Sequence, residues 1–95
     1  MSSDLRPNTA FLLMAQYGGA AIIPLRLVCR DYFSHLTEEK FLRKALAGEI
    51  KLPVVRIEGS QKAARGIMLT DLAAYIDKQH EKAVREAQQL SGAAA

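Results

Sequence analysis

Basic side chains gather in the middle of this 95-residue chain, and they are the residues whose chemistry stands out. Between positions 40 and 65, seven lysines and arginines face two glutamates, a local surplus of five within a net charge of +3. The cations are Lys40, Arg43, Lys44, Lys51, Arg56, Lys62 and Arg65, and the glutamates are Glu49 and Glu58. Because ammonium and guanidinium groups at this density pair with phosphate, we expect a polyanionic partner.

No other group of side chains in the sequence has the spacing of a redox, metal-binding or catalytic site. The single cysteine, Cys29, has no partner for a disulfide and no histidine at a metal-ligand spacing, so we expect no redox centre, metal or other cofactor. The adjacent Glu38 and Glu39 diverge by about 100° on a helix, and His35 and His80 have no catalytic partner in the sequence. Since the sequence also lacks a nucleophile motif and a phosphate loop, we expect a protein that is not an enzyme.

Two short helices are predicted over residues 25–34 and 37–47, joined by a tight turn. Along the first, the apolar residues Leu25, Val28, Cys29 and Tyr32 recur at helical spacing on one face, where Cys29 is expected to be a buried core residue. In the second, Thr37 suits the N-cap position and Gly48 suits the C-terminal end. Two short helices joined in this way are typical of a helix-turn-helix.

The second of these helices has two opposed faces. The predicted packing face holds Phe41, Leu42, Ala45 and Leu46, and the opposite face holds Lys40, Arg43, Lys44 and Ala47. Three cations alone fit a solvated surface helix equally well, but the preceding helix and turn favour a DNA recognition helix. Arg43 is the residue that we expect to read a base edge, because guanidinium pairs bidentately with guanine.

Residues 53–69 predict a β-hairpin that would form the wing beside the recognition helix. The expected phosphate contacts on and before this wing are Lys51, Arg56, Gln61, Lys62 and Arg65. Ser34 and Thr37, at the entrance of the recognition helix, are candidates for further phosphate contacts, although capping suits Thr37 as well. A last helix is predicted over residues 70–90, with Thr70 as its cap.

These elements predict an α+β fold, a small winged helix-turn-helix of excisionase-like layout, in one domain over residues 9–90. Residues 1–8 are expected to form a flexible arm and residues 91–95 a disordered tail. Near the N-terminus, residues 11–17 and 20–25 predict a β-hairpin joined at Gly18-Gly19, and a short helix over residues 9–16 is the competing interpretation. The apolar residues 11–14 suggest either a subunit interface of a homodimer or, equally, simple core packing, and the last helix is the rival interface.

Three segments of the chain carry a more specific pattern: FLLMAQYGGAAIIPL (11–25), VCRDYFSHLTEEKFLRKALAGEI (28–50) and LPVVRIEGSQKAARG (52–66). They resemble the pyocin activator protein PrtN family, over about Thr9 to Asp77. The resemblance implies a bacterial transcription activator of bacteriocin genes that binds a short double-stranded DNA element upstream of their promoters, with RNA polymerase as a second candidate partner.

Two further functions stay open at the level of sequence. The excisionase-like layout also fits an architectural factor that bends DNA, and the apolar N-terminal segment fits a protein-interaction module such as an antirepressor. No apolar stretch approaches the roughly 20 residues that a membrane span needs, and we expect a cytoplasmic protein with no membrane partner.

Overall fold

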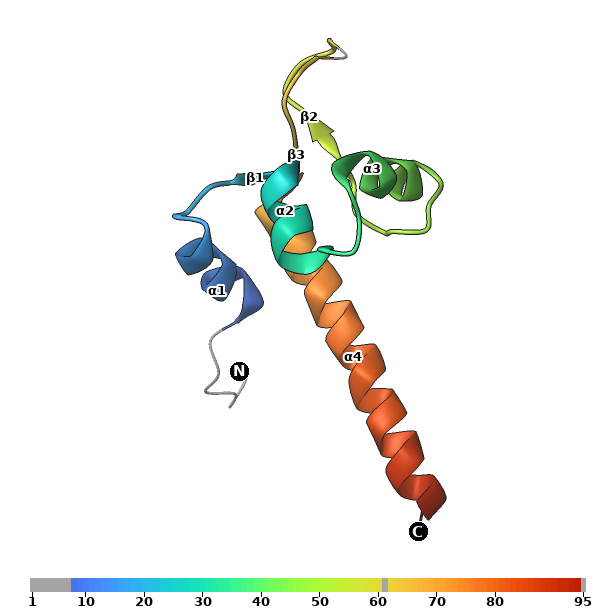
Figure 1. Ribbon diagram of the computed structural model, residues 1–95. Helices are drawn as coiled ribbons and strands as arrows, with labels where there is room; N and C mark the ends of the chain where they lie inside the picture. Colours follow the sequence, from blue (N-terminus) through green and yellow to red (C-terminus); the bar gives the residue numbers. More distant parts are fainter. Residues whose placement is uncertain (1–7, 61, 95) are drawn as a thin grey trace.

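The computed structural model of the protein describes residues 8–60 and 62–94. Within these residues the chain forms four helices and a three-stranded antiparallel sheet (Figure 1). In order they are α1 (Thr9–Gln16), β1 (Ile22–Pro24), α2 (Leu25–Tyr32), α3 (Glu38–Leu46), β2 (Val55–Arg56), β3 (Arg65–Met68) and α4 (Leu69–Ala94). A helical pair followed by an antiparallel hairpin is the layout of a small winged helix-turn-helix domain, so the predicted α+β fold is confirmed.

The segment before β1 is a helix, so the predicted N-terminal β-hairpin is wrong and the competing helical interpretation is confirmed. Asn8 Oδ1 accepts a hydrogen bond from the backbone N–H of Phe11 at 2.7 Å, which caps the start of α1. Gly18 and Gly19 end the helix with φ angles of +63° and +78°, which side chains with a Cβ rarely adopt. Leucine, methionine and alanine, unbranched at Cβ, favour the helix between these two ends.

The partner of β1 is β3, the central strand of the sheet, which has β2 on its other edge. Gly66 of β3 pairs with Pro24 of β1 and with Val55 of β2. A Cβ at position 66 would lie 2.6 Å both from Ile22 Cγ2 and from the backbone oxygen of Ile23. The close approach of β1 to β3 therefore requires glycine at this position.

A single cluster of buried apolar side chains joins the helices to the sheet. Its members are Leu13, Ile23, Leu25, Val28, Cys29, Phe33, Phe41, Ile50, Leu52, Ile67, Leu69, Leu72 and Ala73. Cys29 is buried as predicted, and burial raises the pKa of its thiol. Phe33, which follows α2, packs edge-on against Phe41 of α3 with ring centroids 4.9 Å apart, and its centroid lies 5.9 Å from that of Tyr75 in α4. The turn between α2 and α3 is thus part of the core and fixes α3 on it.

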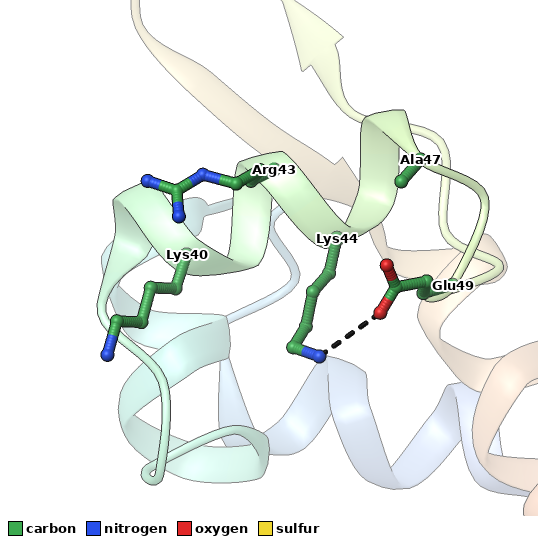
Figure 2. Close-up of a pocket in the computed structure, with 5 residues that line it drawn as sticks. All are labelled: Lys40, Arg43, Lys44, Ala47 and Glu49. Carbon is green, nitrogen blue, oxygen red and sulfur yellow. Dashed lines mark hydrogen bonds and ion pairs between the residues drawn. The ribbon is translucent and has the colours of Figure 1, made fainter.

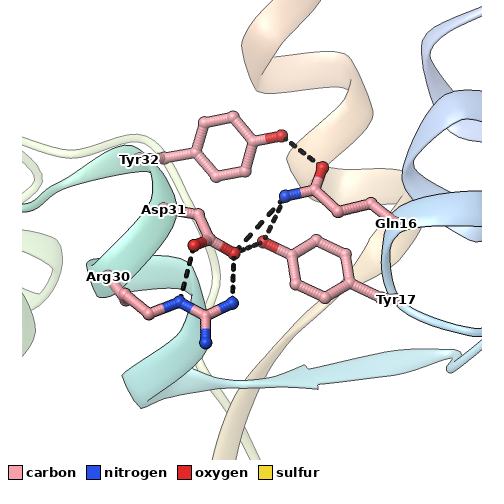
Figure 3. Close-up of polar contacts among 5 residues, drawn as sticks. All are labelled: Gln16, Tyr17, Arg30, Asp31 and Tyr32. Atoms are coloured by element: carbon pink, nitrogen blue, oxygen red, sulfur yellow. Dashed lines mark hydrogen bonds and ion pairs between the residues drawn. The ribbon is translucent and has the colours of Figure 1, made fainter.

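A polar cluster joins the end of α1 to the last turn of α2 (Figure 3). The Tyr17 hydroxyl donates to Asp31 Oδ2 at 2.6 Å, and Arg30 Nε donates to Asp31 Oδ1 at 2.7 Å. Gln16 donates to the same carboxylate at 3.4 Å and accepts from the Tyr32 hydroxyl at 2.9 Å. The Arg30 guanidinium and the Tyr17 hydroxyl hold the pKa of Asp31 at about 2, whereas burial and the Asp31 carboxylate raise the pKa of Tyr17 above its usual range. An ionised carboxylate therefore ties α1 to α2 at neutral pH.

The last helix, α4, begins directly after β3. Thr70 consequently lies inside its first turn and not at the predicted N-cap. The first turns pack on the core through the buried Leu72 and Ala73, and Thr9 Oγ1 of α1 donates a hydrogen bond to Asp77 Oδ1. α1 and the body of the domain therefore hold only the first part of this helix.

Beyond Ile76, α4 leaves the body and projects as a single helix (Figure 1). The side chains of residues 77–92 are exposed. The helix continues through residues 91–94, for which the sequence predicted a disordered tail. The predicted arm over residues 1–8 lies outside the described residues, except for Asn8.

Candidate nucleic-acid interface

The recognition helix predicted from the sequence is α3, and its two ends are fixed by local hydrogen bonds. Thr37 Oγ1 accepts from the backbone N–H of Lys40 at 3.1 Å, so the predicted N-cap is confirmed. At the other end, Gly48 has a φ of +78°, and the backbone N–H of Glu49 donates to the carbonyl of Lys44 at 2.9 Å. This Schellman motif folds the chain back over the last turn of α3 and brings Glu49 beside Lys44.

The packing face of α3 is narrower than the sequence predicted. Phe41 is completely buried, and Leu42 and Ala45 are half-buried against the core. Leu46, which the sequence placed on this face, is 82% exposed. At about 100° per residue it lies about 140° from Phe41, outside the buried arc that is centred between Phe41 and Ala45. Leu46 therefore borders the exposed face.

The exposed face of α3 forms the wall of a hollow of about 240 Å³ (Figure 2). Its lining residues are Lys40, Arg43, Lys44, Ala47 and Glu49. Lys40 and Lys44 extend from the same side of the helix, while the Arg43 guanidinium reaches back toward the first turn (Figure 2). The predicted basic face thus brings its three cations together at one surface.

These three cations differ in their electrostatic surroundings. Lys44 Nζ lies 3.2 Å from Glu49 Oε1, and the side chains are 44% and 60% exposed. Among the described residues, Lys40 and Arg43 have no such partner. This ion pair was not predicted from the sequence. Its signal was Gly48 at the end of the helix, because the residue after such a glycine folds back on the last turn.

The predicted wing is present as the hairpin of β2 and β3, whose strands are shorter than the predicted span of residues 53–69. Figure 1 shows it as a thin arm that extends away from the body. Arg56 and Lys62 are exposed on it, and Arg65 is half-buried in β3. Gln61, also predicted as a contact, lies outside the described residues. The wing therefore carries a second group of cations, separate from those of α3.

The other predicted contacts flank α3 in the chain. Ser34 is exposed in the turn before α3, and Lys51 is exposed in the segment that follows it. In the part of the chain that the structure describes, no three histidine, cysteine, aspartate or glutamate side chains are grouped so that they could hold a metal ion. None of the described helices is long and apolar enough to cross a membrane.

A helix-turn-helix with a buried anchor, an exposed basic face and an adjoining hairpin defines this protein as one of the small winged helix-turn-helix class. The family model of the pyocin activator protein PrtN matches residues 9–83. Because this match covers most of the chain, the protein belongs to that family, as the resemblance predicted. The family is one of transcription activators, which is not an enzyme class. No curated protein and no solved structure matches the chain.

Proposed function

We propose that this protein binds the promoter DNA of bacteriocin genes in a sequence-specific manner, with α3 in the major groove and the wing on the phosphate backbone. The observation that carries the proposal is the division of α3 into a face anchored by the fully buried Phe41 and a face that exposes Lys40 and Arg43. A helix held in this way presents its cations in a fixed geometry, which base readout in the major groove requires. Membership of the PrtN family supports the role in activation.

The cations take two different roles in this proposal. Arg43 reads a base edge, because its planar guanidinium can donate two parallel hydrogen bonds to O6 and N7 of guanine. The other basic residues contact phosphates and set the affinity without reading sequence. They are Lys40, Lys44 and Lys51 in and after α3, and Arg56, Lys62 and Arg65 on the wing, with Ser34 and Gln61 as neutral donors. Thr37 serves the interface indirectly, since its hydroxyl fixes the start of α3.

The test is fluorescence anisotropy with a promoter duplex and a scrambled duplex, each titrated at two salt concentrations. Arg43→Ala should weaken binding to the promoter duplex by about 1–3 kcal/mol and reduce its preference over the scrambled one. Lys62→Ala should weaken both duplexes alike and lower the salt slope by about 1. Arg85→Ala, which removes the same charge from the projecting part of α4, is the matched control and should change neither property.

Two outcomes would contradict the proposal. Equal affinity of the unmodified protein for the two duplexes would exclude sequence-specific recognition. Strong bending in a circular-permutation assay, without activation of a promoter reporter, would instead identify an architectural DNA-bending factor.

The active species in this proposal is a homodimer that also contacts RNA polymerase. A dimer with two-fold symmetry presents two copies of α3, so its DNA element should contain two half-sites about one helical turn apart. Selection of bound sequences from random DNA would reveal such a repeat directly.

A further inference from the structure

The projecting part of α4 exposes its side chains to solvent. Between Gln79 and Gly92 every side chain is exposed, over a length of about 20 Å. A helix this short is only marginally stable in water without packing partners. Its apolar side chains nevertheless continue the stripe that faces the core, because Ala83, Ala87 and Leu90 fall within about 60° of Ile76 on the helical wheel. The apolar face of α4 that packs on the core therefore continues along the projecting part, where it is exposed to solvent.

An apolar groove lies at the near end of this stripe, where α4 leaves the body. It has a volume of about 320 Å³, and its walls include Tyr32 and Phe33 at the end of α2 and Tyr75 and Ile76 of α4. At the far end of the stripe stands Leu90, which is 74% exposed. Fourteen residues, or about 21 Å of rigid helix, separate Ile76 from Leu90, so a chain cannot place Leu90 in its own groove.

We propose that two copies of this protein pair antiparallel through the projecting parts of α4, each inserting Leu90 into the groove of the other beside Ile76. Ala83 lies midway between Ile76 and Leu90. A two-fold axis at Ala83 therefore places Leu90 of each copy beside Ile76 of the other. The small side chains of Ala83 and Ala87 allow the two helices to approach closely between these points.

The partner is a second copy because the groove and the side chain that fits it lie on the same face of the same helix. Such a surface is self-complementary under a two-fold rotation. The charges of the projecting part are balanced, so two copies do not repel one another. They are Lys78, Lys82 and Arg85 against Asp77, Glu81 and Glu86.

This pairing deepens the proposed function, since it names the surface that joins the two DNA-binding units. The groove and the hollow beside Lys40, Arg43 and Lys44 have no lining residue in common, so the pairing surface does not include the basic face of α3. The part of α4 that shares the core with α3, from Leu69 to Tyr75, lies about 12–21 Å from Ala83 along the helix axis. The two copies of α3 are then about 24–42 Å apart along that axis, a range that includes the roughly 34 Å between half-sites one turn apart.

The first test measures the mass of the full-length protein by sedimentation equilibrium without DNA, so that its result is independent of DNA binding. The unmodified chain should be a dimer, and Leu90→Asp should raise the dimer dissociation constant at least tenfold. Gln88→Asp, which adds the same charge about 160° away on the helix, should leave the dimer intact. Because Leu90 is exposed in the single chain, its substitution does not disturb the fold.

The second test uses disulfide cross-linking to fix the orientation of the two helices. Two chains with Ala83→Cys should form a covalent dimer under mild oxidation, because position 83 lies on the two-fold axis. Chains with Leu90→Cys should not, because the two positions 90 lie at opposite ends of the pair, and the buried Cys29 does not interfere.

Three results would overturn the proposal. The first is an unmodified chain that is monomeric at all concentrations, and the second is cross-linking of Leu90→Cys to itself, which indicates a parallel pair. The third is a dimer that survives Leu90→Asp, which would transfer the interface to another surface, such as the exposed Phe11, Leu12 and Met14 of α1.

Discussion

Removal of the Glu49 carboxylate tests whether the basic face of α3 contacts phosphate. Glu49→Gln breaks the ion pair with Lys44, in which Nζ and Oε1 are 3.2 Å apart. Both side chains are about half exposed, and a pair of this kind contributes at most about 1 kcal/mol to stability. The fold should therefore survive the substitution, and the Lys44 ammonium then contacts the DNA backbone without competition from Glu49.

The size of the effect follows from the charge of one phosphate contact. At about 4 Å in a high-dielectric environment such a contact is worth about 1 kcal/mol, or about fivefold in affinity at 50 mM salt. Without Glu49 to neutralise it, the Lys44 charge acts fully on its phosphate, which steepens the dependence of log K on log salt by up to about 0.9. The gain in affinity of Glu49→Gln over the unmodified protein should therefore fall from about fivefold at 50 mM salt to about 1.5-fold at 200 mM salt, a decrease of about 3.5-fold. Because phosphate carries no sequence information, the gain should be the same on promoter and scrambled duplexes.

Anisotropy titrations at the two salt concentrations measure both quantities. The matched control is Glu81→Gln, which changes the net charge equally but lies on the projecting part of α4. If Glu49→Gln and Glu81→Gln give the same affinity and the same salt slope, Lys44 does not reach the DNA and the placement of α3 in the groove is refuted.

Two further predictions concern the fold that supports this face. Gly66→Ala should lower the free energy of unfolding in urea by about 1–3 kcal/mol, because the new Cβ would lie 2.6 Å from atoms of β1. The control Gly59→Ala should change this free energy by no more than about 0.5 kcal/mol, because a Cβ at position 59 meets nothing within 4 Å. Equal effects of the two substitutions would contradict the close approach of β1 to β3. The folded-state pKa of Asp31 is lowered from 3.8 to about 2, so its contribution to stability is complete above about pH 4 and is lost as the pH falls toward 2. Acid unfolding followed by circular dichroism should show this dependence weakened in Asp31→Asn, and an unchanged acid transition would show that the carboxylate does not tie α1 to α2.

The parts of the fold that depend on neighbouring residues could be predicted from the sequence. Thr37 and Gly48 mark the ends of α3 because capping and left-handed backbone involve residues a few positions apart. The pairing of β1 with β3 could not be predicted in this way, since it joins Ile23 to Ile67 across most of the domain. The glycines at 18 and 19 suit a hairpin and a helix end equally, and long-range pairing with β3 decides between the two.

Within the candidate site, the sequence predicted the cations but not the extent of the packing face. On a helical wheel of α3 the apolar Leu46 was grouped with Phe41 on one packing face. In the structure only a narrow arc of α3 contacts the core, and Leu46 lies outside it. How wide an arc is buried depends on how α2 and the turn at Phe33 approach the helix, and the pattern of α3 alone does not contain that information.

The same turn that ends α3 also makes its three cations unequal. The left-handed backbone at Gly48 directs Glu49 against Lys44, so Lys44 must give up one ionic partner before it gains another. Within residues 8–60 and 62–94, Arg43 and Lys40 have no ionic partner to lose. Of the three cations, Arg43 has the planar geometry that matches guanine. Substitution by alanine should therefore reduce specific binding most at Arg43, less at Lys40 and least at Lys44. The sequence singles out Arg43 but gives no order between Lys40 and Lys44, so the ranking of these two lysine variants tests the effect of the ion pair.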